Sequence, residues 1–570
     1  MDLDIAVIGG GVSGTYSAWR LQEALGNSES IALFEYSDRI GGRLYTVTMP
    51  GLPHVKAEVG GMRYIKGQQP VVTALVEHLK LPTTPFLMGA PSPDGNNEPG
   101  GDKNNLYYLR GKHLRLHELT DPEKLPYHLA WSERGMDPTQ LQKRVMKNIH
   151  PDFDKLSLCE QMKVEAFNQP LYKFGFWNLL YRVLSNEGYR FMKDAGGYEA
   201  NVANSCAVTQ LPATEYGDDR TPFVTLREGF QELPLTLAKR FEEAPGKLPA
   251  AQRLQMNRRL ARIEICEGAY KLHFEPTAGA SETLVVHAKK VILAMPRRSL
   301  ELIEGSFFED PWLKENLPSV LNQSAFKLFL AYERPWWRAL GLVAGRSVTD
   351  LPIRQVYYFG TERDQDEGEP WLNSLLMAAY NDIGTLPFWK GLQQGDLYVG
   401  DKPSYGGEPG PGVPIELMPT DQMVRSAHNQ VEELHGLPEI SPPYAAVYHS
   451  WDDDPYGGGW HEWKAGVRLD QIICKMRKPV AKEAIFIVGE AYSFDQGWVE
   501  GALTTAESTL EDFFELDPPG WLKLGNDTLL PCPCPGCAST DGDHAPSVPA
   551  ARTDGGLVST TPDGDSGKSG

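Results

Sequence analysis

The chain has 570 residues, of which 41% are hydrophobic and 23% charged, and its formal net charge at pH 7 is −20. A chain of this length exceeds what one hydrophobic core usually supports, so it predicts two or three domains. The acidic balance argues against general nucleic-acid binding, because phosphate backbones would be repelled. No apolar run reaches the roughly 18 residues that a membrane-spanning helix needs, so we expect no such helix.

The chain begins with MDLDIAVIGGG, which enters a strand pattern without a basic segment or an apolar signal region before it. As given, this start predicts a cytoplasmic protein. A chain trimmed of its signal peptide, and therefore secreted, would look the same.

Seven cysteines are present. Those with apolar neighbours are expected to be buried thiols, namely Cys159, Cys206, Cys266 and Cys474. The remaining three, Cys532, Cys534 and Cys537, form CPCPGC between prolines. Three thiolates without a nearby fourth ligand make a poor zinc site, so we predict no bound metal.

Hydrophobic spacing divides the chain into strand-like and helical parts. The opening predicts strand, helix and strand over residues 4–8, 15–25 and 31–35. A polar loop over 89–105 precedes helical patterns from about 116 to 205. Further strand patterns cover residues within 222–300, then 325–332, 354–360, 371–380 and 484–488, and a helix follows Gly497. Beyond residue 518 few large apolar side chains remain, which predicts a disordered tail.

A glycine motif lies where the first strand meets the first helix. Gly9, Gly11 and Gly14 form G-x-G-x-x-G, in which two glycines allow close backbone approach and the third lets the helix pack on the strand. A pyrophosphate would bind the free N–H groups of the helix, which begins near Ser13. Glu35 ends the second strand, where a carboxylate would accept hydrogen bonds from an adenosine ribose. This pattern predicts a dinucleotide site.

Two further segments favour FAD over NAD as the dinucleotide. Arg43 follows two glycines and can reach the pyrophosphate from the side opposite the helix. The distant strand 484–488 ends in Gly489–Glu490, which would contact the same ligand from the C-terminal part of the chain. Contacts from both ends of the chain suit a cofactor that is held tightly and not exchanged.

The segments GGGVSG, FEYSDRIGGRL, EVGGMRY and VGEAYSFDQGWVEGA together resemble the flavin-containing amine oxidase superfamily. Within it they look most like L-amino-acid oxidases of the escapin/aplysianin type and bacterial L-arginine and L-lysine oxidases. The resemblance covers roughly residues 3–515. It implies an α/β fold with a Rossmann-type FAD-binding domain, a mixed α+β substrate-binding domain and a helical insertion.

The resemblance also implies how the chain is divided. FAD binding is expected in residues 1–65, 221–300 and 481–517, substrate binding in 66–110 and 301–480, and a helical domain in 111–220. The tail in 518–570, expected to be disordered from its composition, has no counterpart in the family. The implied FAD contacts are Gly9, Gly11, Val12, Ser13, Gly14, Glu35, Tyr36, Arg43, Gly61, Met62, Arg63, Leu260, Gly489, Glu490, Gly497, Trp498, Val499 and Ala502.

Four side chains are expected to act on the substrate. Arg63 resembles the family's carboxylate-binding arginine, whose planar fork donates two parallel hydrogen bonds, and Tyr380 the tyrosine that assists it. Lys327 resembles the lysine that holds a water near flavin N5 for proton relay during reoxidation. Trp498 would wall the site, while the Gly497 carbonyl would accept a bond from the substrate ammonium.

Each of these residues has a structural alternative. Arg63 could serve a structural salt bridge, Tyr380 could be a core tyrosine, and Lys327 could lie on the solvated face of a strand. Trp498 could simply pack a C-terminal helix.

The substrate's side chain is the least constrained part of the prediction. Residues 451–463 resemble a family segment that lines the substrate cavity and are rich in aromatic and acidic side chains. A carboxylate at the far end of the cavity would select arginine or lysine by charge. The candidates are Glu500, Glu462, Asp194 and Glu199.

The implied reaction is FAD-dependent oxidative deamination of an L-amino acid, with a preference for L-arginine or L-lysine, to the 2-oxo acid, ammonia and hydrogen peroxide. The partners are therefore a small amino acid and O2, and a homodimer is allowed because dimers are common among similar oxidases. Three alternatives remain open: an amine or polyamine oxidase, which has no need of Arg63, an amino-acid monooxygenase, and a noncatalytic flavin-binding toxin scaffold.

Overall fold

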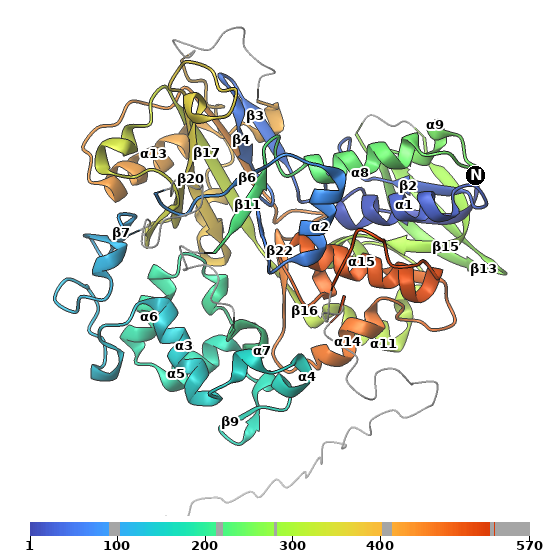
Figure 1. The fold of residues 1–570 in the computed structure, drawn as a ribbon, viewed down its shortest axis with the longest axis horizontal. Coiled ribbons are helices and arrows are strands. Elements are labelled where there is room, and N and C mark those ends of the chain that lie inside the picture. The colour runs from blue at the N-terminus through green and yellow to red at the C-terminus, as the bar shows by residue number, and fades with distance from the viewer. Residues whose placement is uncertain (91–102, 213–220, 279–281, 402–412, 525–528, 531–570) are drawn as a thin grey trace, which may run out of the picture.

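The structure is a computed structural model that describes residues 1–90, 103–212, 221–278, 282–401, 413–524 and 529–530. Two large sheets lie side by side, and a group of helices forms a lobe beneath the second sheet (Figure 1). Both sheets draw strands from distant parts of the chain, so each element below is given with its bounds.

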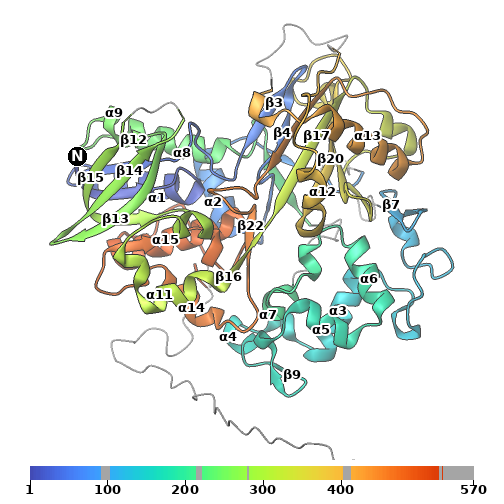
Figure 2. The same cartoon turned by 180° about the vertical axis from the view of Figure 1, so that it is seen from behind.

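The first sheet has the strand order β12-β2-β1-β15-β14-β13, with β23 also paired to β15. Its strands are β1 (Asp2–Ile8), β2 (Ile31–Phe34), β12 (Leu254–Gln255), β13 (Arg258–Cys266), β14 (Ala269–Pro276), β15 (Leu284–Leu293) and β23 (Ile485–Ile487). The central strand β1 runs parallel to β2 and β15, and its Ile8 pairs with both Phe34 and Leu293. Both views place β13 at the edge of the molecule away from the second sheet (Figure 2).

Helices cover both faces of the first sheet, which explains why its central strands are apolar without alternation. One face packs on α1 (Val12–Leu25), α8 (Glu232–Glu243) and α15 (Val499–Phe514). The other face packs on α10 (Arg297–Glu301), α11 (Pro311–Asn316) and α14 (Leu469–Met476). The predicted strand–helix–strand opening is confirmed as a Rossmann-type arrangement, with α1 beginning one residue before Ser13.

The second sheet has the order β21-β17-β20-β19-β18-β7-β8. Its strands are β7 (Leu106–Leu109), β8 (Lys112–Arg115), β17 (Ala325–Tyr332), β18 (Arg346–Thr349), β19 (Gln355–Thr361), β20 (Ser374–Asp382) and β21 (Ala445–Ser450). One face packs on α12 (Leu386–Lys390) and α13 (Asp421–His435), and the other on the hairpin of β3 (Thr46–Met49) and β4 (Leu52–Glu58).

The register of this sheet decides where two predicted site residues lie. Lys327 on β17 is directly opposite Tyr380 on β20. Successive residues of a strand alternate between faces, so Lys327 shares a face with Phe329, which packs on the β3–β4 hairpin. Lys327 and Tyr380 therefore lie on the face of the second sheet that packs on the β3–β4 hairpin.

The lobe beneath the second sheet contains α3 (Pro138–Ile149), α4 (Leu158–Gln161), α5 (Phe176–Val183), α6 (Asn186–Ala195), α7 (Ala207–Gln210) and the hairpin β9 (Glu165–Ala166)–β10 (Gln169–Pro170). Side chains of Asp137, Ser157 and Ser185 accept backbone N–H bonds at the starts of α3, α4 and α6. Such caps satisfy amides that the helix itself leaves unpaired, so short helices can form here.

Short elements join these parts. They are α2 (Pro70–Leu79), α9 (Ala250–Arg253), the three-stranded sheet of β5 (Tyr64–Ile65), β11 (Phe223–Leu226) and β6 (Thr83–Pro85), and the pair β16 (Val320–Gln323)–β22 (Trp460–Trp463).

Two details differ from the sequence-based expectations. The predicted boundary at residue 110 falls inside the β7–β8 hairpin, whose two strands both belong to the second sheet. The predicted disorder from residue 518 is wrong for the described part of the tail: Trp521, Leu522, Leu524 and Leu529 pack on the apolar cluster that α1, α2, α8 and α15 form with the first sheet. The Trp521 ring stacks on that of His78 with a centroid separation of 5.3 Å. Burial of these apolar groups stabilises the ordered conformation of this part of the tail. Residues 531–570, including CPCPGC, lie outside the described residues.

The cysteine prediction is only partly right. Cys206 is a buried free thiol, whereas Cys266 is free but exposed, and Cys159 is disulfide-bonded. In the ranges that the structure describes, no group of three or more His, Cys, Asp or Glu side chains could hold a metal ion. No helix in those ranges has the length and apolar character needed to cross a membrane.

Candidate active site

A cavity of about 680 Å³ is lined by residues of the first sheet, the second sheet and the helical lobe. It collects residues that are far apart in the sequence. From the predicted cofactor set it is lined by Gly9, Gly11, Val12, Ser13, Glu35, Tyr36, Arg43, Gly61, Met62, Arg63, Leu260, Gly489, Glu490, Gly497, Trp498, Val499 and Ala502. Lys327 and Tyr380 also line it, whereas Gly14 and Glu500 do not.

The glycines at the start of α1 have separate roles. A Cβ on Gly14 would lie 1.8 Å from the Gly9 carbonyl oxygen, and one on Gly9 would lie 2.3 Å from that of Ala294. These two glycines are therefore required by packing. A Cβ on Gly11 would meet only the Cα of Gly42, at 3.8 Å, so the protein itself has room for it. The bare backbone at Gly11 faces the cavity beside the N-terminus of α1, where a diphosphate binds well.

Glu35 lies directly after β2 with its carboxylate held in place. One oxygen accepts the Gly10 N–H at 2.5 Å, and the other accepts the Ser37 N–H at 2.8 Å and the Ser37 hydroxyl at 2.7 Å. Glu35 is 5% exposed and lines the cavity. Its position after the second parallel strand suits the hydrogen bonds to a ribose that the sequence predicts.

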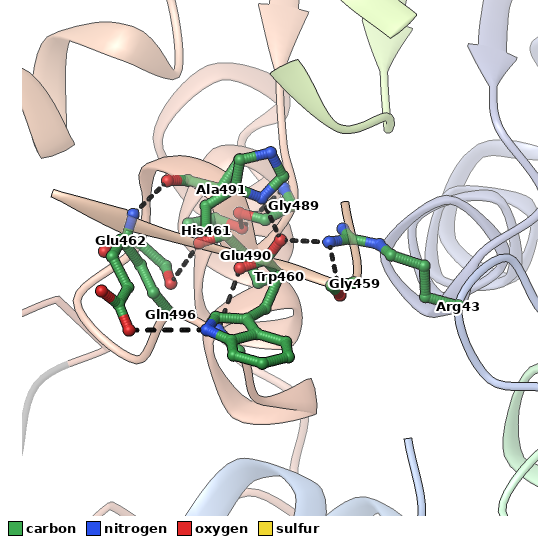
Figure 3. A network of polar contacts seen from close by, with 12 residues as sticks. Arg43, Gly459, Trp460, His461, Glu462, Gly489, Glu490, Ala491 and Gln496 are labelled. Atoms are coloured by element: carbon green, nitrogen blue, oxygen red, sulfur yellow. Dashed lines mark hydrogen bonds and ion pairs between the residues drawn. The ribbon is translucent and has the colours of Figure 1, made fainter. Parts of the chain in front are cut away.

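Arg43, which is half-buried, and the buried Glu490 come from distant parts of the chain and form an ion pair with Nη1 and Oε1 2.5 Å apart (Figure 3). Arg43 also donates to the Gly459 carbonyl at 3.2 Å. The other Glu490 oxygen accepts the Gly497 N–H at 2.9 Å. The sequence predicts that Arg43 binds a phosphate of the cofactor. In the structure its guanidinium also holds Glu490 at the cavity wall, so phosphate binding would be only part of its role.

Arg63 follows the turn Gly60–Gly61 and is 6% exposed. Its guanidinium carbon lies 3.9 Å from the ring centroid of Phe223 and 4.8 Å from that of Phe86, and Nη1 donates to the sulfur of Met88 at 3.1 Å. No acidic side chain of the described residues forms an ion pair with it, so the salt-bridge alternative does not apply within those residues. The Tyr357 hydroxyl also hydrogen-bonds to the guanidinium, but a neutral hydroxyl does not balance its charge. A buried cation without an acidic neighbour among the described residues favours an anionic ligand in the cavity.

Lys327 is 3% exposed, so it does not lie on a solvated strand face. Its Nζ donates to the carbonyl oxygens of Glu58 at 3.0 Å and Gly60 at 2.5 Å, and it lies 4.7 Å from the ring centroid of Tyr380. Burial lowers the pKa of Lys327 to about 7, despite the opposing effect of the Glu58 carboxylate. Such a group can exchange a proton near neutral pH. The Tyr380 ring packs edge-on against Tyr198.

The turn before α15 presents Gly497 and Trp498 to the cavity. Gly497 has φ of 80°, a conformation that favours glycine, and Trp498 is the N-cap of α15. No side chain caps this helix start. The amides that follow, from Val499 onward, therefore face the cavity as donors.

Of the four acids proposed to read the substrate side chain, only Glu462 lines the cavity. Asp194 instead accepts the Tyr127 hydroxyl at 2.7 Å, and Glu199 pairs with Lys193 at 2.8 Å. Both therefore have structural partners outside the site.

Glu500 was predicted to bind substrate, and its position contradicts that role. Its two carboxylate oxygens accept the N–H groups of Val71 and Val72 at 2.9 and 2.8 Å. It thus caps the start of α2 from another part of the chain, because the first amides of a helix lack internal partners.

Replacing Glu500 with alanine is expected to cost about 1–2 kcal/mol of unfolding free energy, the usual cost of losing a helix cap. The KM for substrate should not change. Urea unfolding and steady-state kinetics check both parts. Glu500→Gln keeps one acceptor oxygen and should lose less stability, while a raised KM in Glu500→Ala would restore the original assignment.

Asp495 is a cavity residue that sequence reasoning missed. No hydrogen bond or ion pair from another described residue reaches its carboxylate, and burial alone raises its pKa to about 6. It lies two residues before Gly497 in the DQGWVEGA segment. Its closeness in sequence to Gly497 and Trp498, which were predicted site residues, was the signal that could have identified Asp495.

Fold and cavity together define a protein with a Rossmann-type dinucleotide site whose cavity extends to a second sheet. The family model described as flavin containing amine oxidoreductase matches residues 12–386, and the chain belongs to this family. Its cofactor is FAD. The open space beside Gly11 at the start of α1 and the carboxylate of Glu35 fit this cofactor.

Named relatives extend this similarity over most of the chain. Aplysianin-A of Aplysia kurodai is 28% identical over 538 residues, covering 90% of each chain. Achacin of Lissachatina fulica is 27% identical over 528 residues, covering 90% of this chain and 93% of achacin. An L-amino-acid oxidase of Mus musculus is 24% identical over 516 residues, covering 88% of this chain and 69% of that enzyme.

Among solved structures, putrescine oxidase bound to putrescine has a TM-score of 0.61 and 18% identity, covering 90% of this chain and 100% of that one. At this identity the likeness shows the fold alone.

Proposed function

We propose that the protein catalyses FAD-dependent oxidative deamination of an L-amino acid. The observation that carries the proposal is the buried guanidinium of Arg63, which faces the cavity without an ion-pair partner among the described residues. An α-carboxylate supplies the missing charge and accepts two parallel hydrogen bonds. Similarity to enzymes named L-amino-acid oxidase supports the same assignment.

The protein's groups orient the substrate and manage its protons. In this proposal Arg63 and Tyr380 hold the carboxylate and the Gly497 carbonyl accepts a bond from the amine; all three residues line the cavity. Trp498 and the aromatic walls exclude water. FAD, when bound, would supply the two-electron acceptor for oxidation of the amine, with O2 as the final oxidant; the products would be hydrogen peroxide and an imino acid, which water hydrolyses to the 2-oxo acid and ammonia.

Lys327 serves the proton steps of this cycle in the proposal. Its lowered pKa, about 7, lets it give or take a proton near neutral pH. The two carbonyl bonds leave one of its three N–H directions for a water in the cavity.

The experiment that tests the function is a peroxide assay of the FAD-loaded protein across the twenty L-amino acids, their D-enantiomers and putrescine. Oxidation of L-amino acids alone, with 2-oxo acid as product, supports the proposal. Preferential oxidation of putrescine would overturn it in favour of an amine oxidase. A decarboxylated amide as product would indicate a monooxygenase, and no turnover with any of them would indicate a noncatalytic flavoprotein.

We further propose that the preferred substrates are L-arginine and L-lysine. Two acids of the cavity wall support this, and their environments differ. The oxygens of Glu462 accept bonds from Gln323 Nε2 at 2.8 Å and Trp460 Nε1 at 3.5 Å, and burial raises its pKa to about 7. Asp495 has no such partner among the described residues, and its lower pKa keeps it ionised at neutral pH. Asp495 is therefore the better counter-ion for a cationic side chain.

Asp495→Asn is expected to lower kcat/KM for L-arginine about 10- to 100-fold, the worth of one charge-assisted hydrogen bond, and to leave L-leucine unaffected. In the unsubstituted enzyme, kcat/KM for L-arginine should fall as the pH drops through about 6, because the raised pKa of Asp495 makes the carboxyl neutral below that value. Initial rates at several pH values check both. Equal losses for both substrates would remove Asp495 from side-chain recognition.

We also propose that the protein works in an oxidising compartment, as a secreted protein would. The observation that supports this is that Cys159 is disulfide-bonded, since disulfides persist mainly in oxidising surroundings.

A further inference from the structure

His461 is a fully buried titratable residue beside the cavity that the proposed reaction does not use. It lies on β22, and its Nδ1 is 2.6 Å from Oε1 of Glu490 (Figure 3). Its Nε2 has no hydrogen-bond partner in the described part of the chain. The bond to Glu490 is therefore the polar contact that orients the ring.

The charge states of the two partners decide the direction of this bond. Burial lowers the pKa of His461, so the ring is neutral at pH 7. Burial would raise the pKa of Glu490, but the charge of Arg43 and the hydrogen bonds from His461 and Gly497 outweigh it and hold that pKa well below its usual range. Because the carboxylate is ionised and can only accept, Nδ1 of His461 carries the proton and donates.

The second oxygen of Glu490 connects this bond to the site. It accepts the Gly497 N–H at 2.9 Å. The ring of Trp460 covers the open side of that glycine, since a Cβ on Gly497 would lie 3.5 Å from three Trp460 atoms. Gly497 and Trp498 belong to the loop between β23 and α15, and Glu490 near the start of that loop is fixed from outside it by Arg43 and His461.

We propose that His461 is a positioning residue which, through the Glu490 carboxylate, sets the placement of the Gly497–Trp498 turn against flavin and substrate. Arg43 supplies the charge opposite to that of Glu490. The hydrogen bond from His461 fixes the orientation of the Glu490 carboxylate, so that its second oxygen points at the Gly497 N–H. The inference rests on the proposed function for the presence of substrate beside Trp498. Its flavin part does not depend on which substrate is oxidised.

The test compares His461→Leu, which removes the donor but keeps an apolar side chain, with His461→Asn, whose amide nitrogen occupies a position like Nδ1. His435→Leu is the matched control. His435 is also buried, with one ring nitrogen bonded to the Val431 carbonyl and the other to the Tyr358 hydroxyl, but neither His435 nor these two partners line the cavity, whereas Glu490, the partner of His461, does. Each holoprotein is measured for visible flavin absorbance and circular dichroism, temperature of flavin release, melting temperature, kcat and KM.

His461→Leu is expected to shift the flavin circular dichroism and to raise KM about tenfold, while His461→Asn restores both to within about threefold, as expected for one hydrogen bond to a charged group. His435→Leu should lower only the melting temperature. The inference is overturned if His461→Leu behaves like His435→Leu, or if the asparagine does not rescue. The flavin signals are read without substrate, so a protein that oxidises no amino acid would refute the proposed function while leaving these measurements interpretable.

Discussion

Replacing Arg63 with methionine is expected to lower kcat/KM for L-amino acids about 100- to 1,000-fold, the usual cost of removing one partner of a buried charge pair. Methionine keeps an unbranched stem against Phe223 and Phe86 but offers no donor to a carboxylate. Peroxide release under steady-state conditions measures the loss. Because the carboxylate is absent from agmatine and cadaverine, any activity on these amines should be unchanged.

The same substitution separates the proposed function from its main alternative. An enzyme for amines without a carboxylate has no need of the Arg63 charge, and removing an uncompensated buried cation would then stabilise the fold. Wild-type kinetics on L-amino acids in Arg63→Met would therefore contradict the carboxylate assignment. Arg63→Lys is a second control: it keeps the charge but loses the planar fork, and should recover only part of the activity.

Gly11→Ala is expected to give a folded protein that has lost FAD, whereas Gly14→Ala should fail to fold. The Gly11 Cβ meets no protein atom closer than 3.8 Å, so the added methyl group enters only the space of the cofactor. The Gly14 Cβ would lie 1.8 Å from the carbonyl oxygen of Gly9, which follows β1 directly, and relief of that clash requires α1 to move off the sheet.

Circular dichroism in the far ultraviolet reports folding, and flavin absorbance after gel filtration reports cofactor retention. Gly520→Ala serves as the control, because no atom lies within 4 Å of its Cβ and it should behave as wild type. Full FAD retention in Gly11→Ala would show that the backbone at Gly11 does not approach the diphosphate as closely as proposed.

Much of the dinucleotide domain could be predicted because its signals are local. The apolar run of β1, the glycine spacing and Glu35 lie within one short stretch of sequence, and each has a steric or hydrogen-bonding reason there. The resemblance added distant residues, and the cavity brings most of them together. Whether they contact FAD and substrate in the predicted way remains a prediction.

Side-chain partners were harder to predict. Glu500 and Asp495 lie close together in sequence, yet one caps α2 and the other lines the cavity without a partner among the described residues. Nothing in DQGWVEGA distinguishes the two carboxylates, because the difference depends on where α2 begins in space. The packing of Trp521 on His78 was missed for the same reason, since tail composition says nothing about the surface available to it.

The amino-acid sequence by itself determined the Rossmann-type opening, the cofactor class and the family. These depend on backbone sterics and short-range spacing, which neighbouring residues impose on one another. Only the tertiary structure decided that Arg63 is buried without an acidic partner in the described residues, that Lys327 is desolvated, and that His461 holds Glu490. Burial and charge pairing are set by elements hundreds of residues apart, so they exist only once both sheets have formed.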